Sequence, residues 1–505
     1  MKFFKKLVLL AILSIAFSCQ DDDDSQQNPI NTEVNFQFKT TINVGGEGAS
    51  EISAFDPLTS RLYTVNVESN EITVNNINNL DAVTSENSIN LDAYGAPNSI
   101  SINNGRLAVA VEANPKQNPG SVLLFDTADN TLVNQYTVGA LPDMVTFSAD
   151  GKLLLVANEG EPNDDYTNDP LGSISIIEVA SDVVTTLDFM SFNGQESILK
   201  NQGFRVFGPN ASLAQDVEPE YIAVSDDNTT AWVSLQENNG IARIDLVSKT
   251  IIAIYPLGHK DYSLAGNEID ASDEDNITQL RNWPVYGMYQ PDGITHVSIN
   301  GIDYVISANE GDSREYEGNP GYVGEDRVKD INLDTAIFSE SEDYQNDANL
   351  GRLKIALSEG DIDNDGDYEA LYSYGARSFS IWSANGDLVY DSGNNISQNI
   401  LNITPDAFAD NRSDDKAAEP EAVEVLNIGN ERYILFVGLE RTDQVMVYDI
   451  TNPSSPSFLS ILSRNGDEAP EGLLVIPRTE SPNGKDLLVV SNEDSGTVTI
   501  YENNQ

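Results

Sequence analysis

The chain has 505 residues, a formal net charge of -54 and 40% hydrophobic residues. This length can bury a large core, and the apolar residues gather in short runs of alternating polarity, so the acidic composition does not indicate disorder. An acidic surface of this kind repels nucleic acid and anionic lipid and attracts cations, which excludes a nucleic-acid-binding role.

The N-terminus has the order of a bacterial lipoprotein signal. Three lysines precede an apolar stretch at 7–17, which is too short to span a bilayer as a mature helix. The stretch ends in Ile-Ala-Phe-Ser-Cys at 15–19, which resembles a lipobox, and Cys19 is the only cysteine. We therefore predict a signal peptide at 1–18, a lipid on Cys19 that attaches the protein to the membrane, and an acidic flexible tether at 19–34. The four Asp residues at 21–24 favour an outer-membrane lipoprotein exposed on the cell surface, and the competing interpretation is a solvated linker.

A unit of three short strands recurs after the tether. In the segment 141–179 a Pro-Asp pair opens a β-branched run, a polar turn reverses it, and a second apolar run ends in Asn158-Glu159 before a third run begins. The same order occurs seven times, with opening residues at positions 51, 98, 143, 220, 292, 421 and 471. The shortest intervals between openings are 45, 47 and 50 residues, and three intervals are longer.

Repeats of this length built of short strands are typical of β-propeller blades such as those of WD40 and YVTN repeats. We predict an all-β protein, a monomer, with a seven-bladed β-propeller at 35–505. The seventh copy ends at Tyr501 after its third strand, so we expect the alternating segment 35–44 to complete that blade and close the ring. Insertions are expected at 185–217, with a short helix near 196–201, at 256–289, and from Glu310 to about Tyr374. A hairpin at 376–391 should then supply the outer strands of the fifth blade.

The repeat predicts two rings of acidic side chains near the axis. The first strand of a blade lines the central channel, and its start lies beside the end of the second strand. The inner ring comprises Glu51, Asn98, Asp143, Glu220, Asp292, Glu421 and Glu471, and the outer ring comprises Glu68, Glu112, Glu159, Glu237, Glu310, Glu440 and Glu493. Close carboxylates repel by roughly 1 to 4 kcal/mol per pair, so protons, cationic side chains, backbone amides or bound cations must relieve them. The competing interpretation is that the outer glutamates accept backbone N–H groups from the next blade and fix blade spacing.

Several segments carry a family resemblance: LPDMVTFSADGKLLLVANEGEPNDDYT, FRVFGPNASLAQDVEPEYIAVS, WPVYGMYQPDGI, SANEGDSREY, EDRVKD, YGARSFSIW, DNRSDDKAAEPEAV, GLER and SPNGKDLLVVSNEDSGTVTIY. Together they resemble the choice-of-anchor I family of bacterial surface proteins over nearly the whole mature chain. Members are named for varying C-terminal sorting signals, whereas this chain ends at Gln505 without one, and we expect the N-terminal lipid to replace it. The family is similar to animal mesenchyme-specific cell-surface glycoproteins, and some members are labelled alkaline phosphatases. A propeller scaffold does not determine chemistry, so the resemblance does not establish an enzyme.

The sharpest local motif is a run of alternating aspartates at 361–367. Asp361, Asp363, Asp365 and Asp367, with Gly366 and Glu369, match the start of a calcium loop, although Tyr372 stands where an EF-hand has its bidentate Glu. We predict calcium as the cofactor of this loop. A second acidic run, at 270–275, is interpreted as a solvated charge run. The chain has two separated His residues, which disfavours zinc or iron chemistry.

Arginines near the ring glutamates complete the predicted site. Arg314, Arg327 and Arg441 follow ring positions of the fifth and sixth blades and either neutralise carboxylates or hold an anionic ligand. The predicted ligand-binding residues are Asp292, Glu310, Arg314, Arg327, Glu421 and Arg441. The favoured function is a calcium-stabilised, non-catalytic binding or adhesion module with an unknown extracellular ligand, for example an anionic small molecule. The alternative is a calcium-dependent phosphoesterase, in which free Arg side chains point into an open axial pocket.

Overall fold

The structure is a computed structural model that describes residues 32–316, 318 and 321–504. The predicted signal peptide (1–18), the lipidation site Cys19 and residues 20–31 of the tether lie outside the described residues. Of the helices in the described part of the chain, none is both long and apolar enough to cross a membrane.

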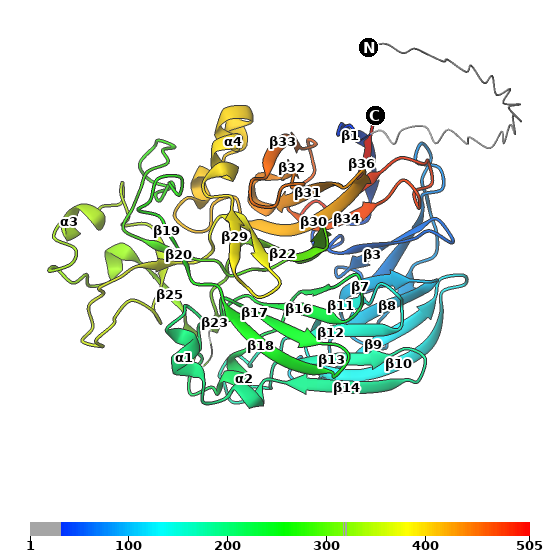
Figure 1. Cartoon of the computed structure of the whole chain (residues 1–505), viewed down its shortest axis with the longest axis horizontal. Helices are drawn as coiled ribbons and strands as arrows, with labels where there is room; N and C mark the ends of the chain where they lie inside the picture. The colour runs from blue at the N-terminus through cyan, green and yellow to red at the C-terminus, as the bar shows by residue number, and fades with distance from the viewer. Residues whose placement is uncertain (1–31, 317, 319–320, 505) are drawn as a thin grey trace, which may run out of the picture. The chain divides into compact units, whose positions relative to one another are not determined.

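The described chain is an all-β protein whose sheets are antiparallel apart from one parallel pair in an insertion (Figure 1). Seven of the sheets within the described residues have four or five strands. In chain order they are β2 (Ser53–Asp56), β3 (Arg61–Asn66), β4 (Glu71–Asn76) with β5 (Thr84–Ser85) and β6 (Ile89–Asn90); β7 (Pro97–Asn103), β8 (Arg106–Val111), β9 (Pro119–Asp126) and β10 (Thr131–Ala140); β11 (Pro142–Phe147), β12 (Leu153–Asn158), β13 (Ser173–Glu178) and β14 (Val183–Asp188); β15 (Ile222–Val224), β16 (Thr230–Leu235), β17 (Gly240–Asp245) and β18 (Thr250–Pro256); β21 (Ile294–Ile299), β22 (Ile302–Asn309), β28 (Ser378–Ser383) and β29 (Leu388–Asp391); β30 (Pro420–Gly429), β31 (Arg432–Leu439), β32 (Gln444–Asp449) and β33 (Ser457–Leu462); and β34 (Pro470–Ile476), β35 (Leu487–Asn492), β36 (Thr497–Asn503) and β1 (Phe36–Asn43). We number these sheets one to seven in this order.

The first strands of the seven sheets contact one another in sequence. Contacts run from β2 through β7, β11, β15, β21, β30 and β34, and β34 returns to β2. A cavity of about 370 Å³ is lined by residues from these same first strands. The strand expected at 35–44 forms as β1 and pairs antiparallel with β36, so the two ends of the domain share sheet seven. This cyclic order is the arrangement of a β-propeller.

The burial of each strand follows its position in the sheet. The second strand β12 is buried from Leu154 to Asn158, the first strand β11 alternates, and the outermost strand β14 has no buried residue. A sheet packed on both faces needs apolar residues on both, which explains the continuous apolar run of the second strands. Seven hydrophobic clusters each join two successive sheets of the described chain, including sheets seven and one.

The N-terminal boundary of the domain lies slightly earlier than the sequence indicates. Val34, which we assigned to the tether, packs against the cluster between sheets six and seven. The backbone carbonyl of Glu33 accepts a hydrogen bond of 3.1 Å from the side chain of Asn503. Residues 32–34 therefore belong to the folded domain.

The insertions carry the remaining elements. These are η1 (Met190–Phe192), α1 (Glu196–Lys200) and α2 (Leu213–Asp216) before sheet four; β19 (His259–Asp261) and β20 (Tyr286–Met288) before sheet five; β23 (Glu315–Tyr316), β24 (Tyr322–Val323), β25 (Glu325–Arg327), η2 (Val328–Asp330), α3 (Ser341–Tyr344), β26 (Lys354–Ala356) and β27 (Tyr372–Ser373) within sheet five; α4 (Asn395–Ile403), η3 (Pro405–Ala407) and η4 (Asp410–Arg412) before sheet six; and η5 (Glu440–Thr442) within it. The short helix expected near 196–201 is α1.

Two insertions share a hydrophobic core of their own. Trp283 and Tyr262, before sheet five, pack with Val328, Leu350 and Leu371 from the insertion within sheet five. In Figure 1 these insertions form the part that carries β19, β20, β25 and α3.

The acidic run at 270–275 supports this second core rather than lying in solvent. Asp270 is 3% exposed. Arg352 donates to both carboxylate oxygens of Asp273, at 2.8 and 2.9 Å. The interpretation of this run as solvated was therefore wrong, because the packing of two distant insertions could not be read from the local sequence.

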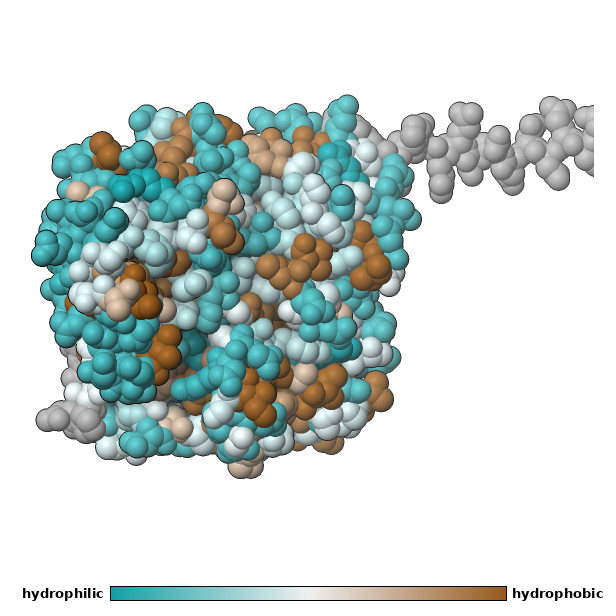
Figure 2. All heavy atoms as spheres, turned by 60° about the vertical axis from the view of Figure 1, so that its left-hand side comes forward, coloured by the Kyte–Doolittle hydropathy of each residue, from teal (hydrophilic) through white to brown (hydrophobic). Residues whose placement is uncertain are grey.

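The surface in Figure 2 is mainly hydrophilic, with apolar residues scattered over it. The exposed large apolar side chains belong to separate elements, for example Leu58, Ile198 and Ile362. Scattered apolar residues are ordinary on a folded protein and do not by themselves mark an interface.

Candidate functional site

The opening residue of each repeat lies in a β-bulge. Pro142 pairs with Asn158, the next paired residue is Met144, and Asp143 between them has no partner on β12. Sheets two, six and seven have the same register shift after Pro97, Pro420 and Pro470. A bulge re-aims a side chain away from the regular face of the sheet. The Pro-acid pair of the sequence therefore encodes a bulge that directs an acidic side chain to the end of the first strand.

Sheets one, four and five make this bulge through equivalent backbone bonds. In sheet five the N–H of Asp292 donates to Ala308, and the N–H of Ala308 donates to Gly293, so two residues face one. In sheet four Glu220 and Tyr221 face Ser234 in the same way. All seven repeats therefore have the same β-bulge at the start of the first strand.

The bulged residues of sheets three to seven and the second-strand glutamates of sheets three to six converge on one cavity of about 400 Å³. We call it the axial cavity. Its lining residues are Asp143, Glu159, Glu161, Glu220, Gln236, Glu237, Asp292, Glu310, Asp312, Lys416, Glu421, Glu440, Arg441 and Glu471. Eleven of these carry a carboxylate, and nine of the eleven are ring positions that the repeat predicts.

The rings are incomplete in sheets one and two. Glu51, Asn98, Glu68 and Glu112 do not line the axial cavity, and neither does Glu493 of sheet seven. Glu68 instead accepts the backbone N–H of Gly46 at 2.9 Å. The side chain of Asn98 donates to the carbonyl of Pro142 in the next sheet at 3.2 Å. These members of the rings join neighbouring sheets, which is the structural role that competes with ligand binding.

Burial makes the ionised form of the cavity carboxylates unfavourable. Burial raises the pKa of Asp143 to about 7, and the charges of Asp292 and Glu237 act in the same direction. Burial also raises the pKa of Glu310 to about 8 against the opposing effect of Lys416. The pKa of Glu220 lies well above its usual range for the same reason. The cavity therefore favours anything that supplies positive charge.

The cationic residues near the cavity are engaged by carboxylates. Lys416 donates to Glu310 at 2.6 Å. Arg441 contacts Glu419 at 3.1 Å and Glu440 at 2.9 Å, and 38% of its side chain is exposed. These two residues line the axial cavity, as the prediction for Arg441 requires.

The structure places the other two predicted arginines elsewhere. Arg314 is 4% exposed, and its guanidinium binds Asp216 at 3.0 Å and Glu218 at 2.7 Å; it does not line the axial cavity but lines a second cavity beside it. Arg327 contacts Asp414 at 2.5 Å and lines neither the axial cavity nor the cavity beside it. The acidic partners come from insertions and interblade connections, whose packing the sequence did not indicate.

A second cavity of about 360 Å³ adjoins the axial cavity and shares Glu161, Glu237, Asp312 and Lys416 with it. Its wall includes the insertion of sheet five, where the hydroxyl of Tyr316 donates to Glu161 at 3.3 Å. This insertion reaches the loop between β12 and β13, since the N–H of Gly318 donates to the carbonyl of Asp164 at 3.0 Å. The insertion of sheet five therefore forms a side wall of the second cavity and contacts sheet three.

Four cavity residues escaped the sequence analysis. Glu161 and Asp312 each follow a ring glutamate by two residues, in the segments NEGEP and NEGDS. This shared two-residue spacing could have identified Glu161 and Asp312 from the sequence. Gln236 and Lys416 carry no comparable pattern, because one precedes a ring position and the other lies in the connection before sheet six.

The predicted calcium loop is folded around its first aspartate. Asp361 accepts the backbone N–H groups of Asp365 and Gly366, each at 3.1 Å. One carboxylate oxygen each of Asp361, Asp363 and Asp365 lie within 4.8 Å of one another. Asp367 and Glu369 group instead with Asp334, a residue that the motif did not include. The arrangement offers hard oxygen ligands of the kind that Ca²⁺ takes.

Fold and site together define a β-propeller with an acidic axial cavity. The chain belongs to the choice-of-anchor I family, since the sequence model of the choice-of-anchor I domain matches residues 51–453. It is similar to Gigasin-3a of Magallana gigas, with 32% identity over 190 residues, which cover 31% of this chain and 66% of that protein. The chain thus spans just under two thirds of the length of that relative.

Three solved structures are similar in their chain course at low identity. The WD40 repeats of RRP9 give a TM-score of 0.49 at 9% identity, over 93% of this chain and all of theirs (100%). Hydrazine synthase of Kuenenia stuttgartiensis gives 0.47 at 12%, over 90% of this chain and 95% of that one. The β-propeller domain of Cps50 (Swd1) of Myceliophteria thermophila gives 0.46 at 8%, over 93% and 100%.

Proposed function

We propose that this protein is a lipid-anchored, cell-surface seven-bladed β-propeller that binds a ligand, without catalysis, at the axial cavity. The ligand contributes positive charge, either as an organic cation or as a metal ion. An anionic ligand, the class named from the sequence, would enter together with a cation.

The observation that carries this proposal is the composition of the axial cavity. Eleven carboxylates line about 400 Å³, and the two cationic residues there, Lys416 and Arg441, are already bound to Glu310, Glu419 and Glu440. Buried carboxylates of one sign repel one another and attract cations into a cleft. The cavity lies where the first strands of sheets three to seven begin, close to the axis of the ring, which is a common place for a ligand site on this scaffold.

The pairing of the arginines supports a binding module over the alternative phosphoesterase. Phosphoryl transfer needs cationic side chains aimed at the phosphate. Arg314 and Arg327 are bound by Asp216, Glu218 and Asp414, and neither lines the axial cavity.

The test of this function uses two probes on the purified full chain. Putrescine serves as a small organic dication in calorimetric titration without calcium, and p-nitrophenyl phosphate serves as a phosphoester with and without calcium. We expect saturable putrescine binding that added salt weakens, and no turnover of the ester. Binding should weaken at least tenfold in Glu421→Gln with Glu471→Gln, and stay unchanged in the matched variant Glu68→Gln with Glu112→Gln. Turnover that depends on the cavity glutamates, or the absence of saturable binding, would overturn the proposal.

Calcium at the loop 361–369 is proposed as a stabilising ion separate from the ligand site. The loop lies in the insertion of sheet five, next to the second hydrophobic core: the backbone of Leu333 bridges that of Tyr368. An ion held there would join Asp334 to the aspartate run and fix one edge of that core.

The anchor is proposed from the lipobox-like end of the N-terminal segment. Membership in a family of cell-surface proteins supports a surface location. The test is growth in labelled palmitate followed by membrane fractionation, with expression of Cys19→Ala in parallel. We expect label and membrane association in the native chain only, and an acylated, membrane-bound Cys19→Ala protein would contradict the anchor.

A further inference from the structure

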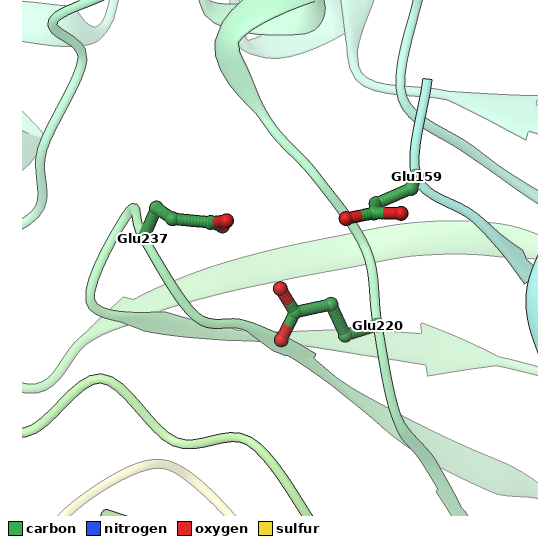
Figure 3. Close-up of side chains that lie close together, drawn as sticks. All are labelled: Glu159, Glu220 and Glu237. Carbon is green, nitrogen blue, oxygen red and sulfur yellow. The ribbon is translucent and has the colours of Figure 1, made fainter. Parts of the chain in front are cut away.

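Three carboxylates in the axial cavity face a common space with no fixed counter-charge. Glu159 follows β12 in sheet three, whereas Glu220 precedes β15 and Glu237 follows β16 in sheet four. One oxygen of each lies within 4.8 Å of the other two. Figure 3 shows the three carboxylates pointing toward one another from these separate elements. We call this group the open triad.

Two oxygens of the open triad are buried and unpartnered. Glu220 and Glu237 are 7% and 5% exposed, and the Oε2 atom of each has no hydrogen-bond partner. Within the described residues, no ion pair reaches the carboxylates of Glu159, Glu220 or Glu237. A buried polar atom without a partner destabilises the fold, and more so when it is charged. Native proteins rarely retain two such atoms side by side unless something binds them.

The cationic residues that act on the charge of the open triad are bound to other groups. Lys116, which acts on Glu159, pairs with Glu161. Arg314 acts on the charge of both Glu159 and Glu237, yet its nitrogens donate to Glu218 at 2.9 Å and Asp216 at 3.0 Å. These bonds hold the guanidinium at 4.6 Å from the centre of the Phe207 ring. Arg314 therefore acts on the charge of the open triad without forming an ion pair with it.

We propose that the open triad binds a divalent hard metal ion of the calcium class, with Glu159, Glu220 and Glu237 as its protein ligands. This deepens the proposed function, on which it rests, by naming the cation that one side of the axial cavity takes. Oxygens on one Ca²⁺ ion lie about 2.3 to 2.6 Å from it, so any two are at most roughly 5 Å apart, which the spacing of the triad satisfies. A set of carboxylates without His or Cys suits Ca²⁺, Mg²⁺ or Mn²⁺ rather than zinc or copper. The remaining coordination positions face the axial cavity, where water or oxygen atoms of a ligand can occupy them.

The open triad is separate from the calcium loop, so the test first removes calcium binding at the loop. Asp363→Ala with Asp365→Ala in the full chain provides the background protein. After removal of metal by a chelator, Ca²⁺ is titrated calorimetrically. We expect one saturable site in the background protein, and an affinity at least tenfold lower when Glu220→Gln and Glu237→Gln are added. Glu68→Gln with Glu112→Gln, at the same repeat positions in sheets one and two, should leave the affinity unchanged.

A second measurement keeps the proposal testable if the double variant folds poorly. Crystals of the background protein grown with Mn²⁺ should give an anomalous peak between the three carboxylates, and the single variant Glu159→Gln should lose it. No calcium binding by the background protein, a peak elsewhere, or equal loss in the matched variant would each overturn the metal site. Putrescine binding that survives such a result would leave the proposed function standing, whereas loss of both would remove it as well.

Discussion

Two carboxylate triads border the axial cavity, and they differ in how their charge is relieved. Asp292, Glu310 and Glu421 bring oxygens within 4.8 Å of one another, as the open triad does. Lys416 donates to Glu310 at 2.6 Å, so this closed triad carries a permanent ammonium ion. The open triad is likewise made of carboxylates, but the cations that act on it are bound elsewhere, Arg314 by Asp216 and Glu218 and Lys116 by Glu161. The ammonium ion of Lys416 neutralises the closed triad permanently. A carboxylate triad without such an ion is suited to bind an exchangeable cation.

The strongest test of this comparison removes the ammonium. In Lys416→Met, Glu310 becomes a buried carboxylate without a cation, and breaking such a pair costs about 3 to 5 kcal/mol. We expect a loss of that size in urea denaturation with chelator, and partial recovery with calcium because the closed triad now resembles the open one. Lys152→Met removes a pair with Asp150 at 2.7 Å whose lysine side chain is 77% exposed, and should cost less than about 1 kcal/mol. Equal losses in the two variants would contradict the distinction.

A proton is the third way to relieve a ring carboxylate, and Glu51 tests it. Burial, with Glu493 and Asp143 nearby, raises the pKa of Glu51 to about 8 from its ordinary 4.5. The folded protein therefore holds this proton more tightly than the unfolded chain, so the stabilisation is complete below about pH 4.5 and is lost as the pH rises through 8.

At about 1.4 kcal/mol per pKa unit, we expect Glu51 to contribute a loss on the order of 5 kcal/mol to the chelated protein across this interval. Glu51→Gln should decline less than the native protein by about this amount, because Asp143 and Glu310 still lose their protons in the same interval, whereas Glu480→Gln, at an exposed position, should decline as the native protein does. The measurement is urea denaturation at several pH values. A parallel decline in native and Glu51→Gln protein would mean that Glu51 carries no such proton.

The exposed calcium loop extends the comparison to aspartates that lie at the surface, whereas the two triads lie in a buried cavity. Calcium bound to the native state alone at a hundredfold excess over Kd adds about 2.7 kcal/mol. Asp363→Ala with Asp365→Ala should remove that increment in thermal unfolding with and without chelator, while the calcium affinity of the open triad persists. A chelator effect of unchanged size in this variant would show that the loop is not the stabilising site.

The smallest effect is expected at Arg441. Its side chain is 38% exposed, and Glu419 keeps Arg412 at 2.6 Å when Arg441 is removed. Exposed pairs contribute about 0 to 1 kcal/mol, so Arg441→Ala should change the free energy of unfolding by no more than that. Its effect should appear in salt-dependent ligand binding instead. A loss above about 2 kcal/mol would place Arg441 with Lys416 as a fixed counter-charge.

The sequence was sufficient to predict the all-β fold, the strand pairing of each repeat and most of the cavity carboxylates. A period-2 pattern and a repeated Pro-acid pair are local signals, and Asp143 and Glu159 became neighbours because strand register is set by the same repeat. The counter-charges were not predictable in this way. Arg314 was placed beside the ring by its position after Glu310, yet Asp216 and Glu218, from an insertion almost a hundred residues earlier, capture it. Such pairings depend on how insertions fold onto the ring, for which no residue pattern exists.

The pairing of β1 with β36 has a consequence for how the chain could be rearranged. The backbone N–H of Asn504 donates to the carbonyl of Asn35 at 2.9 Å, so the two ends of the domain meet in one sheet. Chain termini that lie this close permit circular permutation. Joining them by a short linker and opening the chain in the turn at 148–151 would move the seam of the ring from sheet seven to sheet three. A lipid anchor at the new N-terminus would then attach the ring to the membrane through sheet three. The axial cavity would take a different orientation relative to the membrane, with all of its lining residues unchanged.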